Sequence, residues 1–424
     1  MSGAISSAWS GFRSALRLPG AAGGDARRVV TVRAARGLVD GLVSVLLASY
    51  LTAIGFTPLQ VGAVVTGTLL GSAALTLATG VIAHRVALRS VLVAASALMV
   101  ATGLGFSLTR SFWLVLVVAV VGTLNPSGGD VSPFLPTEQA LLASEVDAPE
   151  RPRLYATYNV AGGLAVAIGA LGATLPSPIS RATGWSIAGA EQLAFVAYAI
   201  VGIVVGVTYS GLRERRQPSS EGARGQLGTA RRTVLELAAL FSLDSAASGL
   251  VGTALLVLWL HLRFGLSPAA TGLLFSVAGL LGAASQFLAG PLASRIGLVR
   301  TMAYTHLPAN LLLVLAAFAP GPGLAVSALL ARSLFAQMDV PARQSLVMAV
   351  VEPEHRAAAA SVTNVPRSLA AASTPLLAGW LLTCSTFGWP LVIAGLAKAT
   401  YDVVLLLAYR QLPEVPGARR QQPS

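Results

Sequence analysis

Charged side chains stand deep inside long apolar stretches of this sequence, and their chemistry sets the first question. Asp130, Asp244, Arg332 and Arg367 are placed near the middle of such stretches, and Asp40 lies nearer one end. A charge near the centre of a bilayer costs about 2.5–3.5 kcal/mol even on insertion scales, so each of them needs a compensating role. In such a place a carboxylate can bind and release a proton, and an arginine can pair with that carboxylate.

Further polar residues lie in the same stretches, nearer one end or at intermediate depth. They are Arg36, Glu138, Asp339, Arg343, Asn159 and Asn364. Arg36 and Asp40 are spaced i,i+4, so Asp40 either forms a structural ion pair with Arg36 or carries a coupling proton. Asn159 and Asn364 either bond neighbouring helices together or contact a solute.

Arg332, Asp339 and Arg343 fall on a single stripe if residues 323–350 form one continuous helix. Charges on such a stripe cannot face lipid, so the stripe is expected to face protein or water. Asp339 and Arg343 can pair directly. Arg332 lies about two helical turns away and is expected to pair with Asp130 or Asp244.

Other ionisable residues are expected to have no part in binding. Lys398 and Asp402 are spaced i,i+4 and are interpreted as a structural ion pair with each other. His306 is interpreted as a residue without a ligand role, and Glu191 as a solvated residue at a helix edge.

The apolar stretches are long enough to cross a bilayer. Of the 424 residues, 54% are hydrophobic and 11% are charged, far fewer charges than in a soluble domain. Since a helix of about 20 residues spans the bilayer core, we expect twelve spans. They are residues 33–55, 58–84, 89–108, 111–146, 154–175, 189–209, 233–262, 267–293, 298–318, 323–350, 356–383 and 388–409. The fourth contains Asn125-Pro-Ser-Gly-Gly-Asp130, which breaks or kinks a helix, either beside a ligand or as a simple kink.

The basic residues are unevenly distributed between the two sides of such a protein. The net charge is +12, and almost all arginines outside the spans fall on the side of the two termini. Only Arg110, Arg181 and Arg263 fall on the opposite side. The positive-inside rule then places both termini in the cytoplasm, in a multi-pass protein of the plasma (inner) membrane. The charge therefore marks orientation and does not indicate a nucleic-acid partner.

Several other chemistries are not indicated. Cys384 is the only cysteine, so neither an intrachain disulfide nor a cysteine-based metal site is expected. We find no Walker loop, His-rich metal motif or Gly-x-Ser-x-Gly elbow. The sequence thus predicts no enzyme, no metal site and no organic cofactor.

The two halves of the chain resemble each other. The residues Pro136, Gln139, Arg151 and Asn159 recur at the same spacing as Pro341, Gln344, Arg356 and Asn364. Many secondary transporters are built from such repeats. We therefore expect an all-α membrane protein of two pseudo-symmetric six-helix bundles. Its parts are a cytoplasmic tail (1–30), a first half (31–210), a cytoplasmic linker (211–232), a second half (233–410) and a cytoplasmic tail (411–424).

Two loops at matching places carry a recognisable motif. The first reads Gly80-Val-Ile-Ala-His-Arg-Val-Ala-Leu-Arg89, and the second reads Gly290-Pro-Leu-Ala-Ser-Arg-Ile-Gly-Leu-Val-Arg300. Both resemble the signature loop of the major facilitator superfamily, Gly-x-Leu-Ala-Asp-Arg-x-Gly-Arg-Arg, in which the glycine permits a tight turn. The family's aspartate is His84 in the first copy and Ser294 in the second. The signatures of the drug–proton antiporter branch are absent, and the sequence looks like a group of prokaryotic facilitators without an assigned substrate.

The resemblance implies a secondary active transporter that moves a small molecule by alternating access, with the first, fourth, seventh and tenth spans around a central cavity. Proton coupling is favoured; the protein can be an efflux permease, but the sequence does not decide between export and import. A uniporter or an uptake symporter of the same fold is the alternative, and a receptor or scaffold is disfavoured. The expected partners are the bilayer and a small-molecule substrate, the proton is the coupling ion, and the chain acts as a monomer.

On this reading the polar residues divide into two sets. The substrate and coupling candidates are Asp40, Asp130, Asp244, Arg332, Arg367, Asn159 and Asn364. The gate candidates are Gly80, Arg85, Arg89, Gly290, Arg295, Arg300, Arg36, Glu138, Asp339 and Arg343.

The orientation is directly testable. Reporter proteins fused at Ser7 and at Ser424 are expected to be active only in the cytoplasm, because both ends lie on the arginine-rich side. A fusion in the loop that contains Arg181 serves as the control and should report the external side. External activity at Ser7 or Ser424 would contradict the twelve-span topology.

Overall fold

The computed structural model describes residues 23–82, 86–126, 134–147, 150–214, 231–351 and 356–409, and these residues are mostly helical. The first half contains α2 (Gly24–Ala53), α3 (Pro58–Ile82), α4 (Leu88–Leu108), α5 (Phe112–Val121), α6 (Phe134–Ala143), α7 (Arg151–Leu171), η1 (Gly172–Thr174), α8 (Pro176–Thr183) and α9 (Ile187–Ser210). The second half contains α10 (Arg231–Leu250), α11 (Thr253–Phe264), α12 (Pro268–Ile296), α13 (Leu298–Ala317), α14 (Pro322–Ser333), α15 (Asp339–Val350), α16 (Arg356–Ser373), α17 (Pro375–Cys384) and α18 (Trp389–Tyr409).

These helices correspond to the spans expected from the sequence. In the described part of the chain, 7 helices are long and apolar enough to cross a membrane. The remaining spans do not meet these two criteria, length and hydropathy, for reasons that the structure shows. The helices α2 and α13 carry charged or polar side chains, and the pairs α5/α6, α14/α15 and α16/α17 are each one span interrupted in the middle.

The first helix begins earlier than the sequence indicated. We expected the span to start at residue 33, but α2 starts at Gly24. Polar residues lower the hydropathy of the extra segment, residues 24–32 or about two and a half turns, which is why an apolar pattern does not detect it. Contacts within the protein hold it instead, since Arg28 Nη1 donates to Gly211 O at 2.6 Å and to Asp25 Oδ1 at 3.2 Å. Helical structure likewise continues past the expected end of the fifth span through η1 and α8.

Interrupted helices cluster in the spans expected to surround the centre. The fourth span stops at Val121 and resumes at Phe134, with residues 127–133 outside the described part. The seventh is interrupted between Leu250 and Thr253. The two interruptions meet, because Ala254 N donates to Pro126 O at 3.3 Å. Backbone without helical hydrogen bonds is tolerated at membrane depth only where protein or a water-filled cavity surrounds it.

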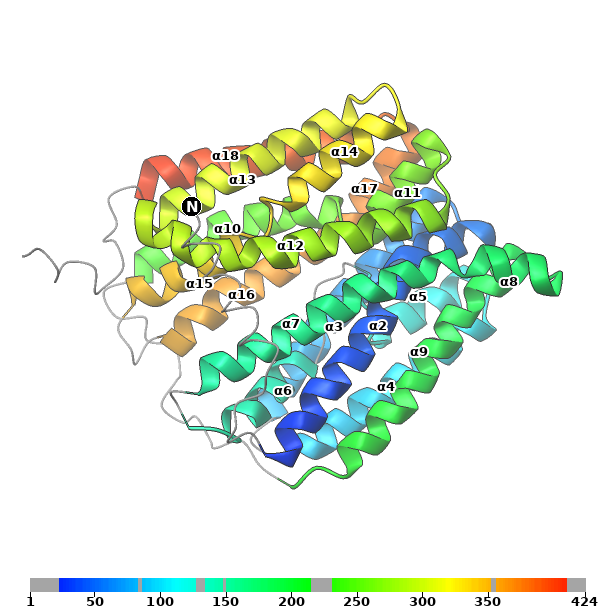
Figure 1. The fold of residues 1–424 in the computed structure, drawn as a ribbon, viewed down its shortest axis with the longest axis horizontal. Coiled ribbons are helices and arrows are strands. Elements are labelled where there is room, and N and C mark those ends of the chain that lie inside the picture. Colours follow the sequence, from blue (N-terminus) through cyan, green and yellow to red (C-terminus); the bar gives the residue numbers. More distant parts are fainter. Residues whose placement is uncertain are drawn as a thin grey trace, which may run out of the picture.

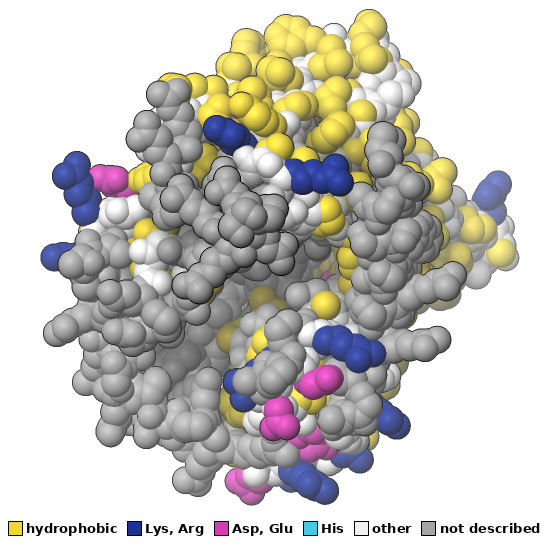
Figure 2. Space-filling view, turned by 60° about the vertical axis from the view of Figure 1, so that its left-hand side comes forward, with side chains coloured by type: hydrophobic (Ala, Val, Ile, Leu, Met, Phe, Trp, Pro, Cys, Tyr) yellow, Lys and Arg dark blue, Asp and Glu magenta, His cyan; other side chains and the backbone are white. Residues whose placement is uncertain are grey.

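The two halves form two bundles that lie side by side (Figure 1). We call the end of the molecule that contains Ser210 and Arg231 the linker end, and the opposite end the far end. In Figure 1 the bundles converge at the far end, where α3 meets α17 and α7 meets α12, and diverge toward the linker end. The space-filling view of the linker end shows a hollow between the bundles, with charged side chains around it (Figure 2).

Small residues allow the bundles to touch at the far end. A Cβ added at Gly379 would lie 2.5 Å from Pro58 O and 2.9 Å from Gly62 Cα. Small residues make close backbone approach possible in membranes, where the hydrophobic effect does not press helices together. One hydrogen bond accompanies this contact, from Leu376 N to Thr66 Oγ1 at 2.8 Å.

The close approach predicts how a larger side chain would act. Gly379→Leu should force α3 and α17 apart and open the far end. A cysteine placed at Thr52, in a Cys384→Ser background, should then react severalfold faster with an impermeant maleimide added from the far side. Gly323→Leu is the matched control, because no atom lies within 4 Å of a Cβ at that position. Equal labelling in Gly379→Leu and in the control would show that this contact does not close the far end.

Candidate functional site

A buried charge pair lies in the core of the first half. Arg36 Nη2 lies 3.4 Å from Glu138 Oε2, with side-chain exposures of 2% and 0%. The hydroxyl groups of Tyr158 and Tyr209 also donate to the Glu138 carboxylate. The Arg36 guanidinium stacks 3.9 Å from the centre of the Phe134 ring. Four helices, α2, α6, α7 and α9, therefore converge on one carboxylate.

This arrangement changes the interpretation of Glu138. We placed it near the cytoplasmic end as a gate candidate, but it is enclosed by the first half and linked to two tyrosines. Asp40 is also buried, one helical turn from Arg36. A search for charged residues does not select neutral tyrosines, so Tyr158 and Tyr209 were not expected in this cluster.

A larger polar cluster lies in the second half and is centred on Asp244. Lys398 Nζ donates to Asp244 Oδ1 at 2.7 Å and to Ser248 Oγ at 2.7 Å. Arg343 Nη1 lies 3.6 Å from Asp244 Oδ2 and 3.0 Å from Asp339 Oδ2. Three helices, α10, α15 and α18, therefore share one network of charges. The expected pairing of Asp339 with Arg343 is confirmed.

The same cluster extends to α13. His306 Nδ1 lies 3.0 Å from Asp402 Oδ1, and Asn310 Nδ2 donates to Asp402 Oδ2 at 2.8 Å. His306 Nε2 lies 4.0 Å from Asp244 Oδ1. The expectation that Lys398 pairs with Asp402 was wrong, because the two side chains turn to partners on other helices. The i,i+4 spacings of His306 with Asn310 and of Lys398 with Asp402 place each pair on one face of its helix. We interpreted the second spacing as a pair within the helix, whereas both faces turn to partners on other helices.

The two clusters repeat one design with the charges reversed. Glu138 and Arg343 occupy corresponding positions, each two residues after the matched prolines Pro136 and Pro341. In the first half the carboxylate on α6 faces an arginine on the first span, Arg36. In the second half the arginine on α15 faces a carboxylate on the seventh span, Asp244. The repeat thus keeps an ion pair at this place. The group that follows the matched proline is an acid in the first half and a base in the second half.

Arg332 does not contact Asp244, one of its two expected partners, and the other, Asp130, lies outside the described residues. No carboxylate lies within 4 Å of Arg332 among the described residues, and its Nε has no hydrogen-bond partner there. Asp244 and Asp339 act on it electrostatically without contacting it. The reason is local: α14 ends at Ser333 and α15 begins at Asp339, so the continuous stripe that we assumed is broken.

Arg367 is held by neutral groups. Its Nε donates to Ser245 Oγ at 3.1 Å, and its Nη1 donates to Asn364 Oδ1 at 3.1 Å. No carboxylate lies within 4 Å of it in the described part of the chain. Asn364 is exposed and Arg367 is partly exposed. Asn159, which corresponds to Asn364 in the first half, is also exposed. Asp130 lies outside the described residues.

The signature loops are only partly described. Arg85 lies outside the described residues. Gly290 lies within α12 and has no atom within 4 Å of an added Cβ, so it forms no turn. The turn is made instead by Gly297, whose φ of 89° favours glycine. Arg295 and Arg300 are exposed at the linker end, and Arg89 is partly exposed.

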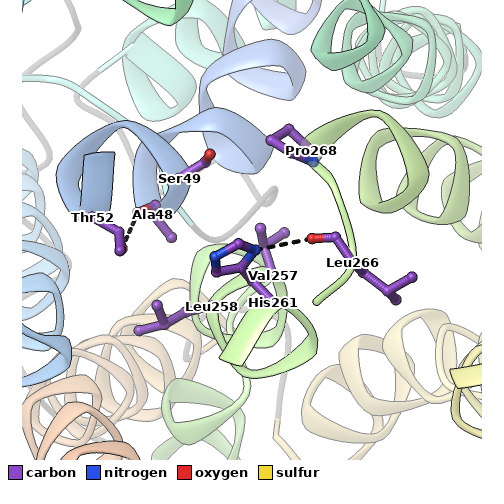
Figure 3. A pocket seen from close by; sticks show the side chains of 8 residues that line it. All are labelled: Ala48, Ser49, Thr52, Val257, Leu258, His261, Leu266 and Pro268. Carbon is purple, nitrogen blue, oxygen red and sulfur yellow. Dashed lines mark hydrogen bonds between the residues drawn. The ribbon is translucent and has the colours of Figure 1, made fainter. Parts of the chain in front are cut away.

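Glu191 also differs from its expected place. It is fully buried and accepts a hydrogen bond of 2.6 Å from Ser49 Oγ, whereas we expected it to be solvated. Ser49 lines a small pocket at the far end, between α2 and α11 (Figure 3). His261, on the opposite wall, is bonded through Nδ1 to Leu266 O at 3.1 Å. This pocket is too small to hold an organic solute of ordinary size.

Comparison with known proteins agrees with this architecture. A family model described as Major Facilitator Superfamily matches residues 29–242 and again residues 237–424. An uncharacterized membrane protein of Saccharomyces cerevisiae is 26% identical over 406 residues, covering 87% of this chain and 90% of the yeast protein.

Solved transporters have the same fold at low sequence identity. The inward-open xylose transporter XylE from E. coli superposes with a TM-score of 0.71 at 13% identity, covering 92% of this chain and 97% of that one. The nucleoside transporter NupG gives 0.68 at 13% identity, covering 92% and 98%. A bacterial homologue of the human lysosomal transporter Spinster, in an inward-facing state, gives 0.65 at 15% identity, covering 91% and 95%.

The Asp244 cluster predicts a compensation between two substitutions. Asp244→Asn leaves the Lys398 ammonium buried without a carboxylate, and breaking a buried pair in this way costs about 3–5 kcal/mol. Adding Lys398→Met removes the stranded charge and should restore most of the melting temperature of the purified protein. Glu236→Gln is the control, because its pair with Arg232 is largely exposed and should contribute little. If the double variant melts no higher than Asp244→Asn, the two groups do not compensate each other.

Proposed function

Since the chain belongs to the major facilitator superfamily and is a transporter of that fold, we propose that it is driven by protons and that Asp244 is the coupling carboxylate. One observation carries this proposal. Asp244 lies on a broken span next to the centre of the molecule, and groups from three other helices converge on it. Binding of a proton to this single carboxylate would therefore loosen three helices at once.

The contacts between the halves suit a transporter that alternates between two states. The halves touch at the far end through small residues and open toward the linker end. A ligand or proton moves such an equilibrium only as far as it binds the two states differently. A proton meets this requirement if the ionised Asp244 is compensated better in the state described here than in the opposite one.

The direction of the pH effect on the two states follows from the ion pairs of Asp244. The charged and titratable groups that act on or contact Asp244 are Lys398, Arg343, His306, Arg332, Arg367, Asp402 and Tyr401. With Asp244 ionised, the pairs with Lys398 and Arg343 hold α10, α15 and α18 together. Protonation removes both attractions, so the state open at the linker end should lose population as the pH falls.

The remaining parts of the proposal concern the setting of the protein. We place both termini in the cytoplasm and the chain in the plasma membrane, where it acts as a monomer on a small molecule. Export and import are both compatible with this fold. A uniporter or an uptake symporter remains the alternative function, and a uniporter would need no titrating carboxylate.

Pulsed electron–electron distance measurements test the proton dependence without a known substrate. Spin labels at Arg153→Cys and Ser345→Cys, in a Cys384→Ser background, report the separation of the halves at the linker end. Between about pH 8 and about pH 5 the long-distance population of the otherwise native protein should fall, because proton binding to Asp244 favours the state in which its pairs with Lys398 and Arg343 are separated.

The matched variant is Asp244→Asn with Lys398→Met, which keeps the core free of a stranded charge. Its distance distribution should be independent of pH, whereas Glu236→Gln should behave like the parent protein. A pH-independent distribution in the parent would favour a uniporter. An unchanged pH response in the double variant would exclude Asp244 as the coupling group.

A further inference from the structure

We propose that the substrate carries an anionic group, a carboxylate or a phosphate, and that Arg367 together with Asn364 binds it. This inference rests on the transport function and deepens it, because it names the chemical class of the solute. It does not depend on proton coupling. The observations that carry it are the partners of Arg367, the incomplete pairing of Arg332 and the exposure of the polar face of α16.

Arg367 is oriented but not neutralised. Its Nε and Nη1 donate to the neutral oxygens of Ser245 and Asn364, so the plane of the guanidinium group is fixed by α10 and by its own helix. No described residue accepts a hydrogen bond from Nη2. Arginine stays charged under all physiological conditions and binds carboxylate or phosphate oxygens through two parallel hydrogen bonds.

Asn364 completes a pair of donors. Its Oδ1 accepts from Arg367, which turns its amide nitrogen away from that contact. No described acceptor takes a hydrogen bond from this nitrogen. The free Nη2 of Arg367 and the Nδ2 of Asn364 therefore lie on neighbouring turns of α16 as unused donors, and an anion has the matching acceptors.

The exposed face of α16 cannot be turned to lipid. Asn364 is exposed, Arg367 is partly exposed, and a guanidinium group in hydrocarbon would be strongly unfavourable. Helix α16 packs against α10 on one side and against α3 of the other half on another. The remaining polar face is therefore turned to water between the halves, where the linker end is hollowed (Figure 2).

The balance of charges in the second half also favours an anionic solute. Arg343 and Lys398 are matched by Asp244 and Asp339, and Asp402 is bonded to His306 and Asn310. Arg332 and Arg367 are then left without a carboxylate in contact among the described residues. Arg332 lies on the tenth span and Arg367 on the eleventh, so both add positive potential on the same side of the centre. A neutral or cationic solute would leave this charge uncompensated.

Thermal stability of the purified protein in a neutral detergent tests the proposal with matched acid and amide probes. The pairs are benzoate with benzamide, lactate with lactamide and succinate with succinamide, and phenyl phosphate is compared with phenol. Ligands that bind the folded state raise the melting temperature. At least one acid should raise it, and its neutral partner should not. Whether a carboxylate or the phosphate raises the melting temperature more shows which of the two anionic groups the site prefers. Neutral detergent removes anionic lipid headgroups as a competing source.

Variants then locate the site. Arg367→Gln should weaken the apparent affinity for the stabilising acid by about tenfold or more, as expected for a lost charge-assisted hydrogen bond. Arg367→Lys should recover only part of it, because the fork of donors is lost. Arg232→Gln, at an exposed position, is the matched control and should change nothing. A melting profile without ligand shows whether each variant is folded.

Three results would overturn the proposal: no acid in the panel stabilises the protein, amides stabilise it as well as acids, or a folded Arg367→Gln protein keeps the parent affinity. The proton-coupling proposal is judged separately by the distance measurements, which contain no organic ligand. A failure of one proposal therefore leaves the other standing.

Discussion

Compensation of buried charge within each half is the constraint on which this structure depends. A single uncompensated ion in the membrane costs several kcal/mol, comparable with the stability of a whole domain. The main buried ion pairs each join groups of the same half: Arg36 with Glu138 in one, and Asp244 with Lys398 and Arg343 in the other. The helices of each bundle are thereby fixed relative to one another, and each bundle can move as a unit.

The contact between the bundles has the opposite character. Gly62 and Gly379 meet there, and two hydrogen bonds that cross it in the described part of the chain, from Ala254 N and from Leu376 N, join neutral groups. Separating such surfaces breaks few strong interactions, so two arrangements of the halves can differ little in free energy. Rigid bundles with a weak joint between them are what alternating access requires. The interrupted spans lie at this joint, where water or protein can satisfy their free backbone groups.

Most of the fold could be predicted from the sequence, because apolar length determines the spans and the repeat of proline, glutamine and asparagine determines the duplication. The start of α2 could not, since contacts such as that of Arg28 with Gly211 replace hydropathy there. The site was predicted in its residue types but not in its pairs. Lys398 turned to Asp244 because spacing along one helix says nothing about a carboxylate on the next. The break before Asp339 moved Arg332 away from its expected stripe.

The reversal of sign between Glu138 and Arg343 has a consequence for biosynthesis. When a chain is inserted into the membrane from its amino terminus, the first bundle must stay in the membrane for some seconds before the second bundle has been synthesised. If Glu138 depended on a cation in the second half, the nascent protein would carry a stranded ion throughout that delay. Because Arg36 is already present, the charge of Glu138 is compensated within the first bundle when the last span of that bundle emerges. Duplication followed by a paired exchange of charges thus gives two bundles that are each self-sufficient during insertion.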